Sequence, residues 1–271
     1  MNLSDMSSEA TARTDRPAQQ TLGGVPSSEL KVIYDEIYDR YAGREAECPV
    51  TTGDIAKART RIRQVLKAYG LMPRAAGLRV LDIGCGLGST SEVFREIGST
   101  VTALDLSKVA IAQAKKRFPG IDFRCQMFPD ELEPGATFDL IWAVDVPGVG
   151  VSDAGQVVTE FLESALKFLK QDGCLVIGWH TDFSGNRKGS WVHWSAAQVK
   201  ELRRLFRASP VLIPPLRFLW LSRIACFLCR HFRRSAPIYF VVRAVDWSGY
   251  DKEGGKERLG QETGDSTCTG R

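Results

Sequence analysis

Hydrophobic positions change their spacing along the chain, and this change separates helical from sheet-forming segments. In the first part of the folded region, apolar side chains recur every three or four residues, which is typical of amphipathic helices. The spacing predicts one helix over residues 27–42 and a second over 52–69. Thr51 or Thr52 is the predicted N-terminal cap of the second helix, and Gly70 is its predicted end.

Further along, short apolar runs alternate with amphipathic stretches. Buried parallel strands read as nearly unbroken apolar segments, so the runs predict strands and the stretches between them predict helices. Strands separated by helices of this length imply right-handed βαβ units and an open parallel sheet. The predicted strands are 79–83, 100–105, 121–125, 138–145, 174–179 and 238–245, and the predicted helices are 88–97, 108–118, 154–170 and 195–208.

These elements predict an α/β fold, a doubly wound sheet with an N-terminal helical lid over residues 27–70. Residues 1–26 and 247–271 are polar and rich in small side chains, which predicts disordered tails around one domain at 27–246.

Composition narrows the classes of protein to consider. The 271 residues are 44% hydrophobic and 25% charged, as in ordinary globular proteins, and a net charge of +4 is too small to indicate a nucleic-acid partner. Seven cysteines do not form a disulfide framework, and the first 20 residues lack the apolar core of a signal peptide, so we expect a cytoplasmic protein. The most apolar stretch, 211–229, contains two prolines and two arginines, which argues against a spanning helix.

The stretch VLDIGCGLGST, residues 80–90, carries the first candidate chemistry. Gly84, Gly86 and Gly88 permit positive φ angles and let a ligand approach the backbone. Their spacing differs from the dinucleotide-binding G-x-G-x-x-G, and the turn lacks the lysine of a phosphate-binding loop. Because Asp82 would repel phosphate, a ligand with a cationic group suits this turn better.

The same residues resemble the first motif of class I S-adenosylmethionine-dependent methyltransferases, [VL]-L-D-x-G-x-G-x-G, and the resemblance continues to about Val245. It implies a Rossmann-like, seven-stranded, mostly parallel sheet whose last strand is antiparallel. It also implies a cofactor-binding core at 71–181 and a substrate region, basic and aromatic, at 182–236.

The resemblance assigns roles to individual residues. Asp82 lies near the methionine amino group, and Asp105, which ends the second strand of the parallel sheet, accepts hydrogen bonds from the ribose hydroxyls, as acidic residues do in dinucleotide-binding folds. Gln126 stands where many relatives have aspartate and reads the adenine amino group, and a lid tyrosine, Tyr41, touches the methionine end. The full set of implied cofactor-binding residues is Tyr41, Asp82, Gly84, Gly86, Gly88, Asp105, Leu106, Gln126, Met127 and Val144.

Methyl transfer mainly requires alignment of nucleophile, methyl group and sulfur, and an oxygen or nitrogen nucleophile can also need a base. The candidates are Asp145 and His180, at the ends of the fourth and fifth strands, and His193 in the loop beyond. Each has a structural alternative: a turn residue, a hydrogen-bonding residue at a strand end, and a packed loop anchor, respectively. No metal site is predicted, because Cys226-x-x-Cys229 lacks a second pair and reads as two buried cysteines.

The region after the fifth strand is basic. Residues 183–243 contain twelve Lys or Arg and one acidic residue, with tryptophans interleaved. An acceptor of anionic or lipid-linked character fits this charge. Residues 216–234 either form an amphipathic helix that contacts the inner face of a membrane or pack on their own domain or on a partner subunit.

The sequence therefore predicts a methyltransferase that uses S-adenosyl-L-methionine to methylate a small-molecule acceptor. O-methylation comes first, because the N-P-P-[YF] signature of amino-group methylation does not follow the fourth strand. The alternatives are a nicotinamide-dependent oxidoreductase and a catalytically silent cofactor-binding module.

Overall fold

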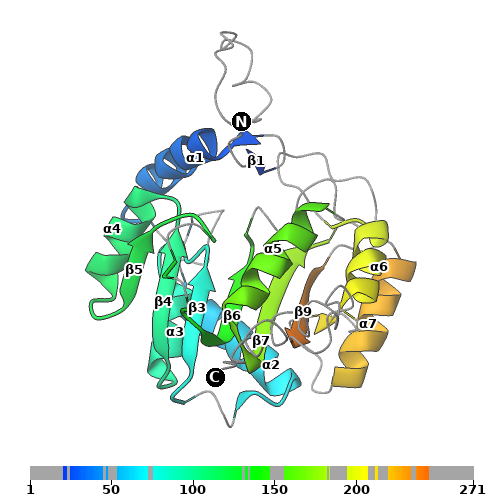
Figure 1. The fold of residues 1–271 in the computed structure, drawn as a ribbon. Coiled ribbons are helices and arrows are strands. Elements are labelled where there is room, and N and C mark those ends of the chain that lie inside the picture. The colour runs from blue at the N-terminus through cyan, green and yellow to red at the C-terminus, as the bar shows by residue number, and fades with distance from the viewer. Residues whose placement is uncertain are drawn as a thin grey trace, which may run out of the picture.

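Seven strands form one sheet, and helices cover both of its faces (Figure 1). The strand order is β5-β4-β3-β6-β7-β9-β8; neighbours run parallel from β5 to β7, and β9 runs antiparallel to both β7 and β8. The seven strands are β3 (Arg79–Ile83), β4 (Thr100–Asp105), β5 (Asp122–Cys125), β6 (Phe138–Val144), β7 (Leu169–His180), β8 (Val211–Leu212) and β9 (Pro237–Arg243).

This computed structural model describes residues 21–22, 25–44, 47, 54–72, 76–129, 132–133, 135–146, 156–181, 183, 194–206, 211–212, 219–232 and 236–243. Its helices are α1 (Ser27–Arg40), α2 (Ile55–Ala68), α3 (Ser89–Glu96), α4 (Lys108–Arg117), α5 (Gln156–Lys167), α6 (Ala196–Leu205) and α7 (Leu219–His231).

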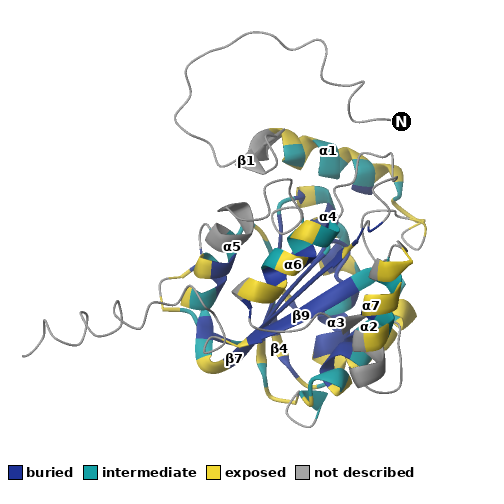
Figure 2. Ribbon diagram, turned by 90° about the vertical axis from the view of Figure 1, so that its right-hand side faces the viewer, coloured by how far each residue is buried: buried dark blue, intermediate teal, exposed yellow. Residues whose placement is uncertain are grey.

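Alternation of side chains along the strands produces two cores, one on each face of the sheet. In β6, Ile141 faces the core that includes residues of α5, α6 and α7, whereas Leu140 and Trp142 face the core that includes residues of α2, α3 and α4. Successive residues of a strand point to opposite faces, so both faces need apolar side chains. The central strands are the most deeply buried part of the ribbon (Figure 2). The prediction of a doubly wound α/β sheet with an antiparallel last strand is confirmed.

Two boundaries near β7 differ from the prediction. The predicted helix 154–170 ends at Lys167, because Leu169 pairs with Phe138 as the first residue of β7. The pairing then shifts register, so that Cys174 lies opposite Leu140. Leu169 has the helical spacing of its neighbours but belongs to the sheet. The seventh strand is β8, two residues that the apolar pattern alone did not distinguish.

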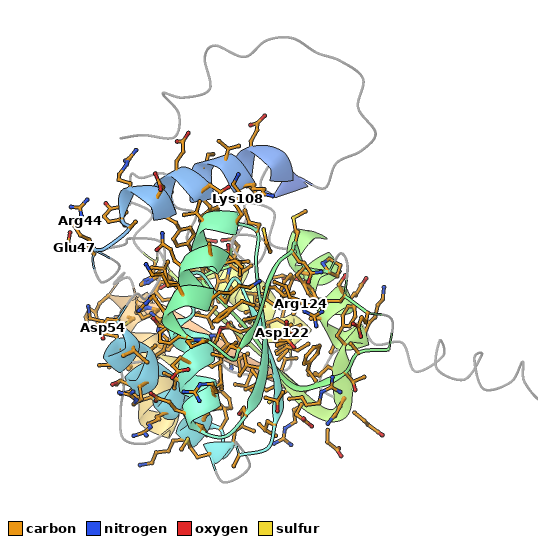
Figure 3. All side chains as sticks on the ribbon, turned by 90° about the vertical axis from the view of Figure 1, so that its left-hand side faces the viewer. Arg44, Glu47, Asp54, Lys108, Asp122 and Arg124 are labelled. Atoms are coloured by element: carbon orange, nitrogen blue, oxygen red, sulfur yellow. The ribbon has the colours of Figure 1, made fainter. Side chains whose placement is uncertain are left out.

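The cap of α2 is also different. Asp54, labelled in Figure 3, accepts hydrogen bonds from the backbone N–H groups of Ala56 and Lys57 at 2.8 and 3.3 Å. The prediction of Thr51 or Thr52 as the cap was wrong: an N-cap oxygen must lie directly before the first helical turn, and that turn begins at Ile55. The helix ends at Tyr69 and Gly70 as predicted, with Gly70 at φ +69°.

The ends of the chain are described only in part. Thr21–Leu22 (β1) pairs antiparallel with Val25–Pro26 (β2), so these four residues form a small ribbon inside the predicted tail. Residues 1–20, 23–24 and 247–271, the rest of the two predicted tails, lie outside the described residues. At the edge of the sheet, β5 carries an ion pair of 2.7 Å between Arg124 and Asp122 (Figure 3), and charges of this kind discourage further strand pairing.

Candidate functional site

The glycine turn after β3 is fixed by hydrogen bonds from its backbone to the end of β4. The N–H groups of Gly84 and Cys85 both donate to the Leu104 carbonyl, at 2.8 and 2.9 Å. Gly84, Gly86 and Gly88 have φ angles of +73°, +51° and +79°, as the sequence predicts for this turn. A Cβ on Gly88 would lie 2.7 Å from Cζ of Phe123, so both the conformation and the space exclude a side chain there.

Asp105 occupies the wall of a cavity that opens beside this turn. Its Oδ2 accepts the Gly86 N–H at 2.8 Å and its Oδ1 accepts the Ser107 N–H at 2.9 Å. Burial raises the pKa of Asp105 to about 6, although the two backbone hydrogen bonds favour the ionised form. Each carboxylate oxygen has a second lone pair, so Asp105 can still accept hydrogen bonds from a diol.

The cavity, called here the glycine-loop cavity, is lined by residues of the lid helix α1, by residues at and after the ends of β3, β4, β5 and β6, and by one residue of α5. Its wall contains residues that the sequence analysis identified and others that it did not. The lining residues are Tyr34, Tyr38, Ile83, Gly84, Leu104, Asp105, Leu106, Gln126, Met127, Phe128, Asp145, Val146 and Phe161. Leu106, Gln126 and Met127 thus lie together with Gly84 and Asp105, as the resemblance implies. Val144 is buried one residue before Asp145 and is not among the lining residues.

Asp82 does not line this cavity. Its side chain is only 2% exposed, and its Oδ2 accepts a hydrogen bond from Ser91 Oγ at 2.6 Å. Ser91 lies in the first turn of α3, so the bond ties β3 to the helix that follows the glycine turn. Burial raises the pKa of Asp82 to about 7. The carboxylate therefore lies beneath the turn and is not exposed in the cavity.

The lid helix contributes tyrosines other than the predicted one. Tyr34 and Tyr38 line the cavity, with ring centroids 6.3 Å apart, whereas Tyr41 packs beside Tyr38 outside the lining residues. Burial raises the pKa of Tyr34, and the nearby Asp105 raises it further, so its phenol stays protonated. The helical repeat explains the difference, because Tyr34 and Tyr38 are one turn apart and Tyr41 follows the last helical residue.

Helix α1 lies across one end of the sheet, beside α4 (Figure 1). Its Asp35 accepts hydrogen bonds from Ser107 Oγ at 2.5 Å and from the Val109 N–H at 3.2 Å. Ser107 is also the N-cap of α4. These bonds attach the lid to the element that follows Asp105.

The predicted catalytic residues separate in space. Asp145 lines the glycine-loop cavity and forms an ion pair of 3.0 Å with Arg61 of α2. His180 is exposed at the end of β7 and lines a different cavity, between α2 and the sheet. His193 lies outside the described residues.

Arg61 and Phe161 were missed by the sequence analysis. Arg61 lies on α2 and Phe161 on α5, two helices that the apolar spacing predicted. The spacing does not show which side chains of a helix lie next to the carboxyl ends of the strands. Cys226 is buried, as predicted, whereas Cys229 is only partly buried and packs against the same core. Among the described residues there is no cluster of His, Cys, Asp or Glu that could hold a metal ion.

The residues present fit S-adenosylmethionine in kind: a carboxylate for a ribose diol, a carboxamide for an adenine edge, and one glycine, Gly84, where a ligand can meet the backbone; Gly86 and Gly88 do not line the cavity. The cavity has a volume of about 80 Å³, well below the ~300–1,000 Å³ typical of ligand sites. Binding of a cofactor of this size therefore requires the cavity to widen.

Comparison with known proteins agrees with this geometry. Residues 80–173 match the family model described as "Methyltransferase domain". "Ubiquinone biosynthesis O-methyltransferase" of Bradyrhizobium sp. (strain ORS 278) is 38% identical over 106 residues, 38% of this chain and 40% of the relative. The protein of the same name from Mesorhizobium japonicum is 32% identical over 133 residues, 42% of this chain and 53% of the relative. The chain spans about half or less of these curated relatives.

Solved structures show the same fold. Magnesium protoporphyrin IX methyltransferase from Synechocystis PCC 6803, crystallised with bound SAM, has a TM-score of 0.53 at 15% identity and covers 84% of this chain and 100% of its own. A complex of DhpI with SAH has a TM-score of 0.52 at 18% identity, covering 79% and 94%. The predicted resemblance to class I S-adenosylmethionine-dependent methyltransferases is confirmed.

Proposed function

We propose that this protein is an S-adenosylmethionine-dependent methyltransferase that methylates an oxygen atom of a small-molecule acceptor. The observation that carries the proposal is the position of Asp105. Its carboxylate ends β4, is oriented by Gly86 and Ser107, and shares one cavity wall with Gln126. Relatives named as O-methyltransferases support oxygen as the nucleophilic atom.

Bound S-adenosylmethionine would supply a methyl group activated by a sulfonium. The chain's own residues bind and orient the reactants. Asp105 would accept the ribose hydroxyls, Gln126 would meet the adenine edge, and Tyr34 and Tyr38 would exclude water from the lid side. Alignment of this kind can contribute roughly 7–11 kcal/mol in favourable cases.

The acceptor hydroxyl loses its proton when the oxygen–carbon bond forms. Asp145 forms an ion pair of 3.0 Å with Arg61, so we assign it the role of orienting that guanidinium. His180 lines the neighbouring cavity and is the proposed base, since its ordinary pKa lies close to neutral pH.

Binding calorimetry tests the cofactor. We expect S-adenosylhomocysteine to bind and NAD(P) not to bind, because the G-x-G-x-G turn and Asp82 do not suit a pyrophosphate. Binding of NAD(P) without S-adenosylhomocysteine would instead support a nicotinamide-dependent oxidoreductase. Transfer of labelled methyl to extracts of small molecules then separates an enzyme from a catalytically silent module, for which no product would form.

We also propose that α7 contacts an anionic membrane surface at its cytoplasmic face. Large apolar side chains on and directly after α7 are exposed: Ile224 (46%), Phe227 (67%), Leu228 (43%) and Phe232 (65%). This side of α7 is on the outside of the domain (Figure 2). The surrounding segment, 183–243, has twelve basic residues and one acidic residue, and such segments are attracted to anionic lipids of the cytoplasmic leaflet. Among the described residues, no helix is long and apolar enough to cross a membrane.

Liposome co-sedimentation tests this contact. We expect the protein to pellet with vesicles containing phosphatidylserine and Phe227→Glu to abolish pelleting. Val32→Glu is a matched control, because Val32 is also exposed (57%) but lies on α1. If Phe227→Glu leaves pelleting unchanged, the exposed face of α7 does not bind the membrane. If the same substitution also converts a dimer to a monomer, the exposed face is a contact between subunits.

A further inference from the structure

A second cavity, called here the α2 cavity, lies between the first half of α2 and the ends of β7 and β9. Its volume is about 400 Å³, within the ~300–1,000 Å³ typical of ligand sites. Lys57, Arg61 and Gln64 reach it from one side of α2, because their spacing of i, i+4 and i+7 places them on one helical face. His180 and Tyr239 line it from the sheet.

Arg61 connects this cavity to the glycine-loop cavity. Its Nη1 donates to Asp145 Oδ2 at 3.0 Å, and Asp145 lines the glycine-loop cavity while Arg61 lines the α2 cavity. Asp145 directly follows β6 at φ +59°, and its N–H donates to the Gly178 carbonyl at 3.0 Å. The guanidinium is therefore held at the boundary between the two cavities by a carboxylate whose own backbone is fixed.

The α2 cavity is positively charged. Lys57 and Arg61 contribute cations, and the described residues that line it include no carboxylate. The ammonium Nζ of Lys57 lies 3.9 Å from Asp54 Oδ2, and the Lys57 side chain is 74% exposed. The guanidinium of Arg61 presents five N–H donors in a planar fork, and the contact with Asp145 uses one nitrogen. Arg61 thus retains donors for an anionic group.

Two neutral groups complete the wall. The Oε1 atom of Gln64 is buried and has no hydrogen-bond partner within the part of the chain that the structure describes. The Gln64 carboxamide is uncharged, so it does not offset the positive charge of Lys57 and Arg61. Burial raises the pKa of Tyr239, which keeps its phenol neutral and adds no negative charge to the cavity.

We propose that the α2 cavity is the acceptor site and that the acceptor bears a carboxylate, bound by Arg61 and Lys57. The inference rests on the proposed methyltransferase function, which requires an acceptor next to the cofactor cavity. A guanidinium fork matches a carboxylate through two parallel hydrogen bonds, and Asp145 fixes the orientation of that fork. Arg61 and Lys57 determine which acceptor binds and how it lies, and they take no part in the transfer of the methyl group.

The test compares two probes that differ only in charge, 3,4-dihydroxybenzoate and 3,4-dihydroxybenzamide. Each is titrated calorimetrically into the full chain saturated with S-adenosylhomocysteine. We expect the carboxylate to bind the unsubstituted protein about tenfold or more tightly than the amide, as for other hydrogen bonds to charged groups. Arg61→Gln removes this preference, and Arg61→Lys restores only part of it because an ammonium lacks the fork.

Two further variants control for folding. Lys57→Gln replaces an exposed side chain, so the fold is kept, and the carboxylate affinity should fall severalfold. Arg63→Gln lies on the same helix, is exposed and is outside the lining residues, so both probes should bind as before. The affinity for S-adenosylhomocysteine should stay within about twofold in Lys57→Gln and Arg63→Gln, and thermal unfolding of Arg61→Gln shows whether it is folded.

The outcomes separate this inference from the proposed function. Two results would overturn the acceptor assignment while the methyltransferase proposal stands, provided that S-adenosylhomocysteine binds. One is that the carboxylate probe binds no more tightly than the amide. The other is that Lys57→Gln and a folded Arg61→Gln leave the affinity for the carboxylate probe unchanged. If (3,4-dihydroxyphenyl)phosphonate binds more than about tenfold tighter than the carboxylate, the carboxylate is replaced by a phosphate-like group. Failure of S-adenosylhomocysteine to bind overturns the methyltransferase proposal itself.

Discussion

The Asp105 carboxylate accepts the backbone N–H of Gly86 at 2.8 Å, so a side chain at the end of β4 holds the glycine turn after β3 in addition to the backbone hydrogen bonds to Leu104. The other oxygen of Asp105 accepts the N–H of Ser107, which caps α4 and is bound by Asp35 of the lid. One carboxylate therefore organises the turn, the next helix and, through Ser107, the lid. This arrangement explains why an acidic residue is kept at a buried position where its charge is costly.

Replacement of Asp105 by asparagine should weaken the binding of S-adenosylhomocysteine by about 10–100-fold. The asparagine side chain has one oxygen and one NH₂ group, so only one of the two backbone N–H groups could still donate to it. The NH₂ group would face the other N–H, and fewer acceptor positions would remain for a diol. Calorimetry measures the change. Asp122→Asn is the matched control, because Asp122 lies on the neighbouring strand β5 and forms an ion pair with Arg124 at the surface, outside the cavity lining. Equal affinities for the two variants would contradict the assignment of Asp105.

Asp82→Asn should make the protein more stable above pH 7 and the cofactor site weaker. Burial raises the pKa of Asp82 in the folded protein from its ordinary value of 3.8 to about 7. Its contribution to stability is therefore complete below about pH 4 and is lost as pH rises through 7. Asparagine avoids this loss and can still accept the hydrogen bond from Ser91.

The free energy of unfolding should rise by roughly 1–3 kcal/mol at pH 8 and change little at pH 4. Denaturant titrations of both proteins at the two pH values provide the measurement. Loss of the buried negative charge should weaken S-adenosylhomocysteine binding severalfold, because its ammonium lies in the field of Asp82. A variant that is less stable than the original protein at pH 8 would show that ionised Asp82 has a compensating partner.

Gly88→Ala should destabilise the fold more than Gly120→Ala. Both glycines have left-handed backbones, at φ +79° and +94°, so alanine is strained by about 1–2 kcal/mol at either position. Only at Gly88 would the new Cβ meet a buried ring, 2.7 Å from Phe123, whereas nothing lies within 4 Å at Gly120. Overpacking should add about 1–3 kcal/mol. Urea unfolding of the two variants gives the difference, and similar midpoints would show that the Phe123 ring moves away freely.

Tyr34→Ala should weaken S-adenosylhomocysteine binding about tenfold, and Tyr41→Ala should leave it nearly unchanged. Tyr34 lines the glycine-loop cavity and would cover the bound ligand, and burial of an aromatic side chain contributes about 1.5–3 kcal/mol. Tyr41 is half-buried outside the lining residues and contacts Arg44, whose Cζ lies 5.6 Å from its ring centroid. If Tyr41→Ala weakened binding more than Tyr34→Ala, Tyr41 would be assigned to the cofactor site, and α1 would have a different orientation in the complex.

Local sequence determined the elements and the glycine turn of this protein. The apolar runs of β3 and β6 and the positive φ angles at Gly84, Gly86 and Gly88 depend on a few contiguous residues, because strand burial and backbone conformation are set by side chains close in the chain. Asp105 was identified in the same way, from its place at the end of β4. The residues that line one wall of the glycine-loop cavity follow from this order of strands.

Only the tertiary structure decided which side chains share a cavity. His180 and Asp145 end neighbouring parallel strands, yet they line different cavities, because α2 packs on the face of the sheet to which the even-numbered residues of β7 point. The ion pair between Arg61 and Asp145 joins positions 84 residues apart. Such contacts depend on the orientation in which two amphipathic elements pack against each other. The periodicity of the sequence shows which face of an element is buried, but it does not show which other element covers that face.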